Sequence, residues 1–242
     1  TVKKAYLTID DSPSADWKEK VEFLSGNEIQ AVWFCTGQAL EARPQFVEFA
    51  LQHNQLIGNH SYDHPYFSMI SVEEGKIQID RTDRILEELL LANGVKDFQR
   101  WFRFPYGDRG DRHAVDVQSG VQQVREFQKH LKQSGYCMPP FAGVSHAWFS
   151  ERQESDPYDW WWSFDCKEWA LDPEFHHYGL RTLEDLVKRM DSDNYDDRVG
   201  LNVSESEELV LIHDHAHSTE LFRPLVEALL ERGVSFVPVP GY

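Results

Sequence analysis

Short apolar runs alternate with longer stretches of helical periodicity along most of the chain. Seven segments rich in apolar, aromatic or β-branched residues predict strands, at residues 3–10, 31–36, 55–58, 101–104, 163–169, 209–213 and 235–239. Helices are expected between them, over residues 12–24, 44–53, 71–93, 114–133, 182–190 and 219–232. Repeated strand–helix units favour parallel strands covered by helices. The pattern predicts an α/β fold, either a barrel or an open sheet, with residues 163–169 also compatible with a loop.

Two helix starts carry local signals. Ser71 and Glu74 stand at the spacing of a capping box, which predicts that a helix begins there. Ser12 followed by Pro13 offers an N-cap with proline at the first helical position. Both signals place a helix directly after a predicted strand or loop, as the alternation requires.

One segment departs from the alternation. Residues 139–162 are irregular and rich in aromatic side chains, which include Trp148, Phe149, Tyr158, Trp160, Trp161 and Trp162. Aromatic faces stack on sugar rings, and they also build small local cores under long loops. Both interpretations stay open, with Trp160 as the candidate for a sugar-binding residue. No linker or repeat divides the sequence, so residues 1–242 are expected to form one domain with this segment as an insertion.

Composition narrows the classes of partner. The 242 residues include 24 Lys and Arg against 41 Asp and Glu, a formal net charge of −17. This charge disfavours nucleic acid and anionic membrane surfaces as partners. No run of about 18 apolar residues is present, so no membrane insertion is expected. Cys35, Cys137 and Cys166 form no CxxC pair, and three buried thiols are favoured over one disulfide with one free thiol.

Candidate chemistry collects where the predicted strands end, which is where parallel α/β sheets carry their sites. Asp10 and Asp11 follow the first strand. His60 and His64 follow the third, at a spacing that places both imidazoles on one face of a helical turn. Two imidazoles and one carboxylate suit an open site for Zn²⁺ or a similar divalent ion. Two aspartates after an apolar strand are equally compatible with a helix cap beside a solvated carboxylate.

Two further predicted strands end on residues whose side chains can take part in catalysis. Arg103 ends the fourth strand and His213 ends the apolar run LVLIH. An arginine there can also bridge surface acids, and a histidine at the rim of a buried strand is often a hydrogen-bonded core residue. His215 and His217 follow closely, so a second metal site is a rival interpretation. It is less favoured because Asp214 is the only carboxylate close by in sequence.

Five ordered segments together resemble the polysaccharide deacetylases, the NodB-homology group that forms carbohydrate esterase family 4. The matching segments are Thr8-Ile9-Asp10-Asp11, His60-Ser61-Tyr62-Asp63-His64, Arg103-Phe104-Pro105-Tyr106, Asp165-Cys166-Lys167-Glu168-Trp169 and Leu211-Ile212-His213. The resemblance implies a single-domain distorted (β/α) barrel of about seven strands. It also implies a metal-dependent hydrolase that removes acetyl groups from N-acetylated amino-sugar polymers or oligomers, such as peptidoglycan or chitin.

The resemblance assigns roles in the chemistry. The implied ligands of one divalent metal are Asp11, His60 and His64. Zn²⁺ is the first choice, with Co²⁺, Ni²⁺ or Mn²⁺ as alternatives. Asp10 is the implied general base, and Arg103 orients it and keeps it ionised through charge pairing. His213 is the implied general acid, which protonates the departing amine.

Further implied roles surround the acetyl group. The backbone N–H of Tyr106 joins the metal in stabilising the oxyanion. Trp169 and Leu211 wall the acetyl pocket, although plain core packing explains both equally well. Glu168 stands where the family carries the Asp that supports His213, and it is one methylene longer. The geometry at Glu168 decides whether that support is kept.

The expected partner is an acetylated glycan. A monomer is expected, and the resemblance implies a secreted, periplasmic or cell-envelope location, with no signal peptide in this chain. An O-acetyl xylan esterase and a non-catalytic carbohydrate-binding homologue are alternatives on the same fold. A serine hydrolase is a further alternative, because Gly143-Val144-Ser145-His146-Ala147 approaches G-x-S-x-G but lacks the final glycine. Sequons at Asn59 and Asn202 are attributed to chance.

Overall fold

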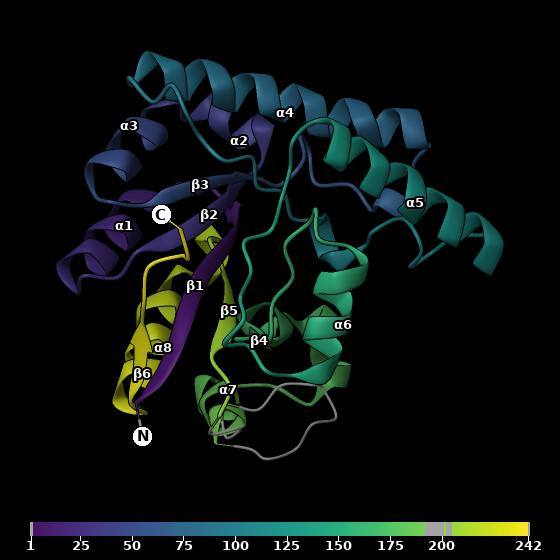
Figure 1. Cartoon of the computed structure of the whole chain (residues 1–242). Coiled ribbons are helices and arrows are strands. Elements are labelled where there is room, and N and C mark those ends of the chain that lie inside the picture. The colour runs from purple at the N-terminus through teal and green to yellow at the C-terminus, as the bar shows by residue number, and fades with distance from the viewer. Residues whose placement is uncertain (1, 192–200, 202–204, 242) are drawn as a thin grey trace.

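A parallel β-sheet forms the centre of the computed structural model, which describes residues 2–191, 201 and 205–241 (Figure 1). Its strands are β1 (Lys3–Ser12), β2 (Ala31–Cys35), β3 (Leu56–Asn59), β4 (Phe164–Asp165), β5 (Glu208–His213) and β6 (Val234–Phe236). Their order is β3-β2-β1-β5-β4, and β6 pairs with the first residues of β1. All five pairings are parallel. The predicted α/β fold is confirmed, and no ladder between the described strands closes the sheet into a barrel.

Helices connect the strands and cover the sheet. They are α1 (Trp17–Gly26), α2 (Gly37–Ala42), α3 (Gln45–Gln52), α4 (Val72–Ala92), α5 (Val117–Gln133), α6 (Ala147–Ser155), α7 (Leu183–Met190) and α8 (Thr219–Glu231). Figure 1 shows α4 and α5 along the upper side of the molecule and α8 beside β6. The capping box of α4 is confirmed, because Ser71 Oγ accepts from the Glu74 N–H and Glu74 accepts from the Ser71 N–H. No described helix is long and apolar enough to cross a bilayer.

Both faces of the sheet are buried, as the continuous apolar runs require. Along β2, Trp33 points into a core built with α1, α3, α7 and α8. Phe34, on the opposite face, belongs to a second core that also contains Phe141, Phe149 and Trp160. The irregular segment at residues 139–162 therefore supplies the cover of the second face, which accounts for its aromatic content.

Two local predictions are wrong. Residues 101–104 form a single bridge, Asn59 with Phe102, rather than a seventh strand. The following Pro105 has no N–H with which to continue the pairing. The helix expected from residue 12 begins only at Trp17, because Ser12 still belongs to β1.

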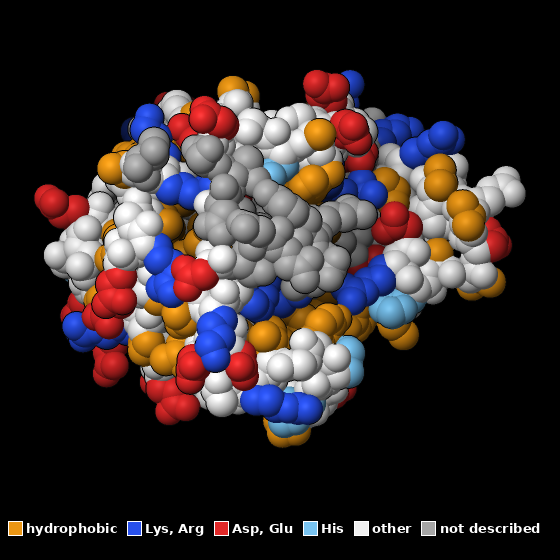
Figure 2. Space-filling model, turned by 90° about the horizontal axis from the view of Figure 1, so that it is seen from below, with side chains coloured by type: hydrophobic (Ala, Val, Ile, Leu, Met, Phe, Trp, Pro, Cys, Tyr) orange, Lys and Arg blue, Asp and Glu red, His pale blue; other side chains and the backbone are white. Residues whose placement is uncertain are grey.

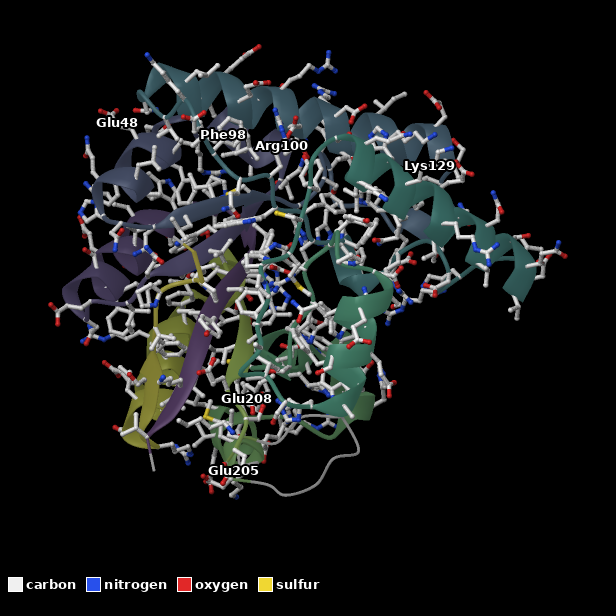
Figure 3. The ribbon with its side chains drawn as sticks, in the orientation of Figure 1. Glu48, Phe98, Arg100, Lys129, Glu205 and Glu208 are labelled. Atoms are coloured by element: carbon white, nitrogen blue, oxygen red, sulfur yellow. The ribbon has the colours of Figure 1, made fainter. Side chains whose placement is uncertain are left out.

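A buried cluster of charged and polar groups lies at the amino end of β5. Glu208 is fully buried and accepts a hydrogen bond from Ser163 Oγ at 2.5 Å. Lys3 Nζ and His146 Nε2 lie 2.9 and 3.0 Å from its carboxylate oxygens. Figure 3 places Glu208 in the lower half of the molecule, beside the amino end of the sheet. These partners compensate the buried carboxylate, so the cluster ties β1, β5 and α6 together.

Candidate metal centre and catalytic site

The end of β1 turns two neighbouring carboxylates toward one site. The register of β1 on β2 shifts between Ile9 and Ser12, and Asp11 has a left-handed φ of 63°. In an unbroken strand Asp10 and Asp11 would point to opposite faces. Instead Asp10 Oδ2 lies 3.6 Å and Asp11 Oδ1 lies 3.3 Å from His60 Nε2. The irregular strand end therefore makes the pair of aspartates part of the same site.

Three ligand atoms converge beside this strand end. One atom each from Asp11, His60 and His64 lies within 4.8 Å of the others. Asp11 Oδ1 is 2.9 Å from His64 Nε2, yet this buried oxygen has no contact of hydrogen-bond geometry. His60 Nδ1 lies 2.8 Å from the carbonyl oxygen of Arg103, which fixes the proton on Nδ1 and leaves the Nε2 lone pair free. Two imidazole nitrogens and the unpaired Asp11 Oδ1 form a set of ligand atoms that fits a divalent metal.

The two histidines meet through an irregular turn. Ser61 and His64 have left-handed φ values of 68° and 64°. The Asn59 side chain accepts from the Ser61 N–H at 2.9 Å, and Ser61 Oγ accepts from the His64 N–H at 3.2 Å. The prediction of a helical turn is wrong, although the two imidazole centroids do lie 4.9 Å apart.

The carboxyl group of Asp11 is electrostatically suited to remain ionised. Burial alone would raise its pKa, but the charge of His64, the hydrogen bond from His215 and the close imidazoles of His60 and His64 hold it well below its usual range. An ionised carboxylate is the form that ligates metals. The sequence connects His215 only with a rival metal site and does not predict its contact with Asp11.

A buried guanidinium holds Asp10. Arg103 Nη1 donates to Asp10 Oδ1 and to Thr8 Oγ1, both at 2.8 Å, while Nη2 donates to the carbonyl of Trp161 at 2.9 Å. Arg103 is fully buried, and this burial lowers its pKa even though the charge of Asp10 opposes the shift. The pairing leaves the second carboxylate oxygen of Asp10 turned toward His60.

His213 lies on the strand next to Asp10, because the two residues are register partners in β1 and β5. Its Nδ1 is 2.8 Å from Glu168 Oε1, which also accepts from the His213 backbone N–H. The longer Glu168 therefore reaches His213. Burial alone would lower the pKa of His213, but the charge and hydrogen bond of Glu168 raise it to about 10. His213 is protonated at neutral pH and can donate a proton.

Trp169 and Leu211 lie beside this pair. The indole Nε1 of Trp169 donates to Asp165 at 3.0 Å, and Asp165 is the register partner of Leu211. Leu211 is almost fully buried, whereas Trp169 is partly exposed and packs edge-on against neighbouring aromatic rings. Asp165 thus fixes the ring of Trp169 close to the His213–Glu168 pair.

Tyr106 lies next to His64, one of the three predicted metal ligands. It has a left-handed φ of 58° in the short turn that follows Arg103. Its ring is half exposed, stacks on Tyr66 with centroids 3.8 Å apart and lies edge-on to His64 at 4.5 Å. The turn therefore brings the backbone of Tyr106 close to the predicted metal ligands.

Left-handed backbone concentrates in the segments that carry the motifs. Among the described non-glycine residues, those with positive φ in these segments are Asp11, Ser61, His64, Tyr106 and Lys167. Among the other described non-glycine residues, only Glu28 and Asn54 have a positive φ. Such positions cost about 1–3 kcal/mol each and cluster at functional sites.

Trp160 does not line the site. Its side chain is fully buried against the three rings of Phe34, Trp101 and Phe141. Its indole N–H donates to the carbonyl of Cys137 at 3.1 Å. The prediction that Trp160 binds a sugar is wrong, because neither face of the ring is accessible.

Its neighbours Trp161 and Trp162 lie closer to the chemistry. Their partly buried rings stack 4.3 Å apart. A Cβ at Gly107, just after Tyr106, would lie 2.8 Å from both rings, so only glycine allows this approach. These two tryptophans, rather than Trp160, connect the aromatic segment to the site.

The rival sites do not assemble. The rings of His213, His215 and His217 are stacked nearly parallel at about 5 Å, so their nitrogens do not converge on one ion. Ser145 is exposed, and the buried ring of His146 bonds Glu208 instead of the Ser145 hydroxyl. The geometry therefore favours neither a metal site built on these three histidines nor a serine nucleophile.

The structure describes one of the two sequons and all three cysteines. The Asn59 amide is buried and donates to the Ile79 carbonyl and the Tyr136 hydroxyl, so it is not available for glycosylation. Asn202 lies outside the described residues. All three cysteines are free thiols; two are buried and Cys137 is half buried.

A surface hollow of about 590 Å³ lies away from these residues. It is lined by the end of α4, residues 96–100 and Gly241. Figure 3 shows Phe98 and Arg100 near the upper edge of the molecule. None of the metal-binding or acid–base candidates lines it, so this hollow is separate from the site.

Comparison with known proteins agrees with this geometry. A family model described as polysaccharide deacetylase matches residues 1–124. A peptidoglycan-N-acetylglucosamine deacetylase from Bacillus cereus is 32% identical over 103 residues, which are 42% of this chain and 36% of the relative. A chitooligosaccharide deacetylase from Azorhizobium caulinodans is 31% identical over 103 residues, 42% of this chain and 47% of the relative. The matches thus span between a third and a half of these relatives.

The fold extends the likeness beyond the matched segment. The structure of the peptidoglycan deacetylase PdaC from Bacillus subtilis superposes with a TM-score of 0.59 at 19% identity, covering 98% of this chain and 88% of that one. This likeness concerns the fold alone, whereas the family model spans just over half of the 242 residues. The chain belongs to the polysaccharide deacetylase family.

Proposed function

We propose that the chain is a metal-dependent deacetylase that removes N-acetyl groups from N-acetylglucosamine-containing glycans. The observation that carries the proposal is the three-ligand group of Asp11, His60 and His64, flanked by Asp10 on one strand and His213 on the next. The names of the relatives from Bacillus cereus and Azorhizobium caulinodans support the reaction class and the two candidate substrates, peptidoglycan and chitin oligomers. A cell-envelope or extracellular location follows from the same substrates.

Each residue has a task in this chemistry. A divalent ion, when bound, supplies Lewis acidity for the acetyl carbonyl and for a water molecule. Asp10 accepts the proton of the attacking water, held in place by Arg103 at 2.8 Å. The N–H of Tyr106 donates to the oxygen on which negative charge develops. The remaining task, protonation of the leaving group, falls to His213.

The state of His213 favours an amide over an ester as the substrate. An amine is a poor leaving group unless it is protonated as the C–N bond breaks, whereas an alkoxide leaves more readily. Glu168 raises the pKa of His213 to about 10, so the proton is available at neutral pH. This favours N-deacetylation over the O-acetyl xylan esterase alternative.

Acetate release from a panel of glycans tests the proposal. Metal-free protein reloaded with Zn²⁺ is incubated with chitin oligomers, peptidoglycan and acetylated xylan, with and without a chelator. The expected result is chelator-sensitive acetate release from the N-acetylated glycans. Release from acetylated xylan alone would assign the esterase activity instead, and no release from any substrate would leave a carbohydrate-binding homologue.

A further inference from the structure

The two oxygens of Asp11 face different histidines. Oδ1 lies on the side of His60 and His64, at 3.3 and 2.9 Å from their Nε2 atoms. Oδ2 lies 2.5 Å from Nε2 of His215. Because an ionised carboxylate only accepts, the imidazole Nε2 must be the donor. His215 thus occupies the oxygen that points away from the other two ligands.

The backbone around His215 is anchored to the strand end that carries Asp11. The N–H of Asp214 donates to the carbonyl of Asp10 at 2.9 Å. The buried Asp214 carboxylate accepts from Lys20 Nζ at 2.6 Å and from the Ser14 N–H at 2.8 Å. The distance between His215 and Asp11 is therefore set by a fixed framework rather than by one mobile side chain.

The ring of His215 is also restrained from both faces. It stacks on His213 with centroids 5.1 Å apart and on His217 at 4.8 Å, with interplanar angles of 26° and 20°. Its Nδ1 is buried and has no hydrogen-bond partner. Leaving a buried polar atom unpaired is unfavourable, so an apolar side chain would fill the space at lower cost. Packing alone does not account for a histidine here.

We propose that His215 is a positioning residue for the metal ligand Asp11. Its Nε2–H holds Oδ2, so the carboxylate binds through Oδ1 and its lone pair is directed between His60 and His64. Hydrogen-bond partners of metal ligands commonly contribute about 10–100-fold to metal affinity. The inference rests on the metal site of the proposed function and adds to it a residue that is not one of the three ligands.

Zinc titration of the metal-free 242-residue chain tests this role without measuring turnover. His215→Ala removes the donor and should raise the dissociation constant for Zn²⁺ about 10–100-fold. His215→Gln keeps an N–H donor at a similar reach and should restore affinity to within about threefold of the parent protein. His217→Ala is the matched control, since it removes an exposed ring of the same stack with no contact to Asp11 recorded.

A spectroscopic readout separates positioning from loss of folding. The d–d absorption of Co²⁺ bound to the His215→Ala variant should change in energy or intensity, while that of the His217→Ala variant should match the parent protein. Unchanged Zn²⁺ affinity in His215→Ala, or an equal loss in His217→Ala, would overturn the inference. If the parent protein binds Zn²⁺ but releases no acetate, the proposed function fails while the role of His215 stands. If it binds no metal, both fail.

Discussion

At the scale of single residues, the candidate site depends on the backbone conformation at the end of β1. Asp10 and Asp11 were placed at a strand end, yet their convergence depends on the left-handed φ of Asp11, a backbone state that its residue type does not announce. One feature of the sequence points to the contact between His215 and Asp11. Residues two apart on an extended segment share a side, so His213 and His215 could have been assigned to the same edge.

The first prediction concerns the base. Asp10→Asn keeps the size of the side chain and one oxygen, but removes the proton acceptor. Turnover should fall about 10²–10⁴-fold, the usual contribution of general base catalysis. Because Asp10 is paired with Arg103 and is not one of the three ligand atoms, Zn²⁺ affinity should stay within about threefold. Acetate release and zinc titration are measured on the same preparation; a parallel loss of both would make Asp10 a ligand instead.

A second prediction follows from the pKa of His213. Below about 10 the ring carries its proton, and it loses this proton as the pH rises through that value. Glu168→Gln removes the charge that raises the pKa, so the alkaline limb of kcat/KM should move to lower pH. Glu168→Asp tests whether a shorter carboxylate still reaches Nδ1 of His213. If it does, the alkaline limb of kcat/KM stays at high pH. A Glu168→Gln profile that overlays the parent profile would show that Glu168 does not set this ionisation.

At the scale of elements, periodicity located most helices and strands because both faces of the sheet are buried and each helix has one apolar side. It failed at residues 101–104, where the apolar run reads as a strand. Burial alone explains that run: Trp101, Phe102 and Phe104 belong to cores, while only one bridge to Asn59 forms. Apolar character reports burial, and strand pairing needs N–H donors in register as well.

The packing of α4 on α5 gives a third prediction. Gly75 lies inside α4, and a Cβ added there would overlap the buried ring of Phe127 and press on Phe67. Gly75→Ala should destabilise the protein by about 1–3 kcal/mol through overpacking, although alanine is the better helix former. Gly26→Ala is the matched control, because nothing lies within 4 Å of that Cβ position. Urea unfolding measures both, and equal effects would refute the steric account.

At the scale of the whole molecule, excess negative charge coexists with mixed surface charge. The view from below in Figure 2 shows acidic and basic side chains interspersed on that face, with apolar side chains between them. The net charge of −17 therefore does not make this face uniformly acidic. Its effect at longer range is an attraction for cations, which is greatest at low ionic strength.

Deacetylation changes the charge of the glycan, and this gives the last prediction. The acetylated substrate is neutral, whereas the amino sugar produced is largely protonated near neutral pH. A protein of charge −17 should therefore bind product more tightly at low salt. Raising NaCl from about 10 to about 150 mM shortens the Debye length from about 30 to about 8 Å. Product inhibition by deacetylated oligomers should weaken over that range, while KM for the acetylated oligomer stays constant. A neutral sugar of the same length serves as the control ligand; if salt leaves product inhibition unchanged, the acidic composition has no part in handling the product.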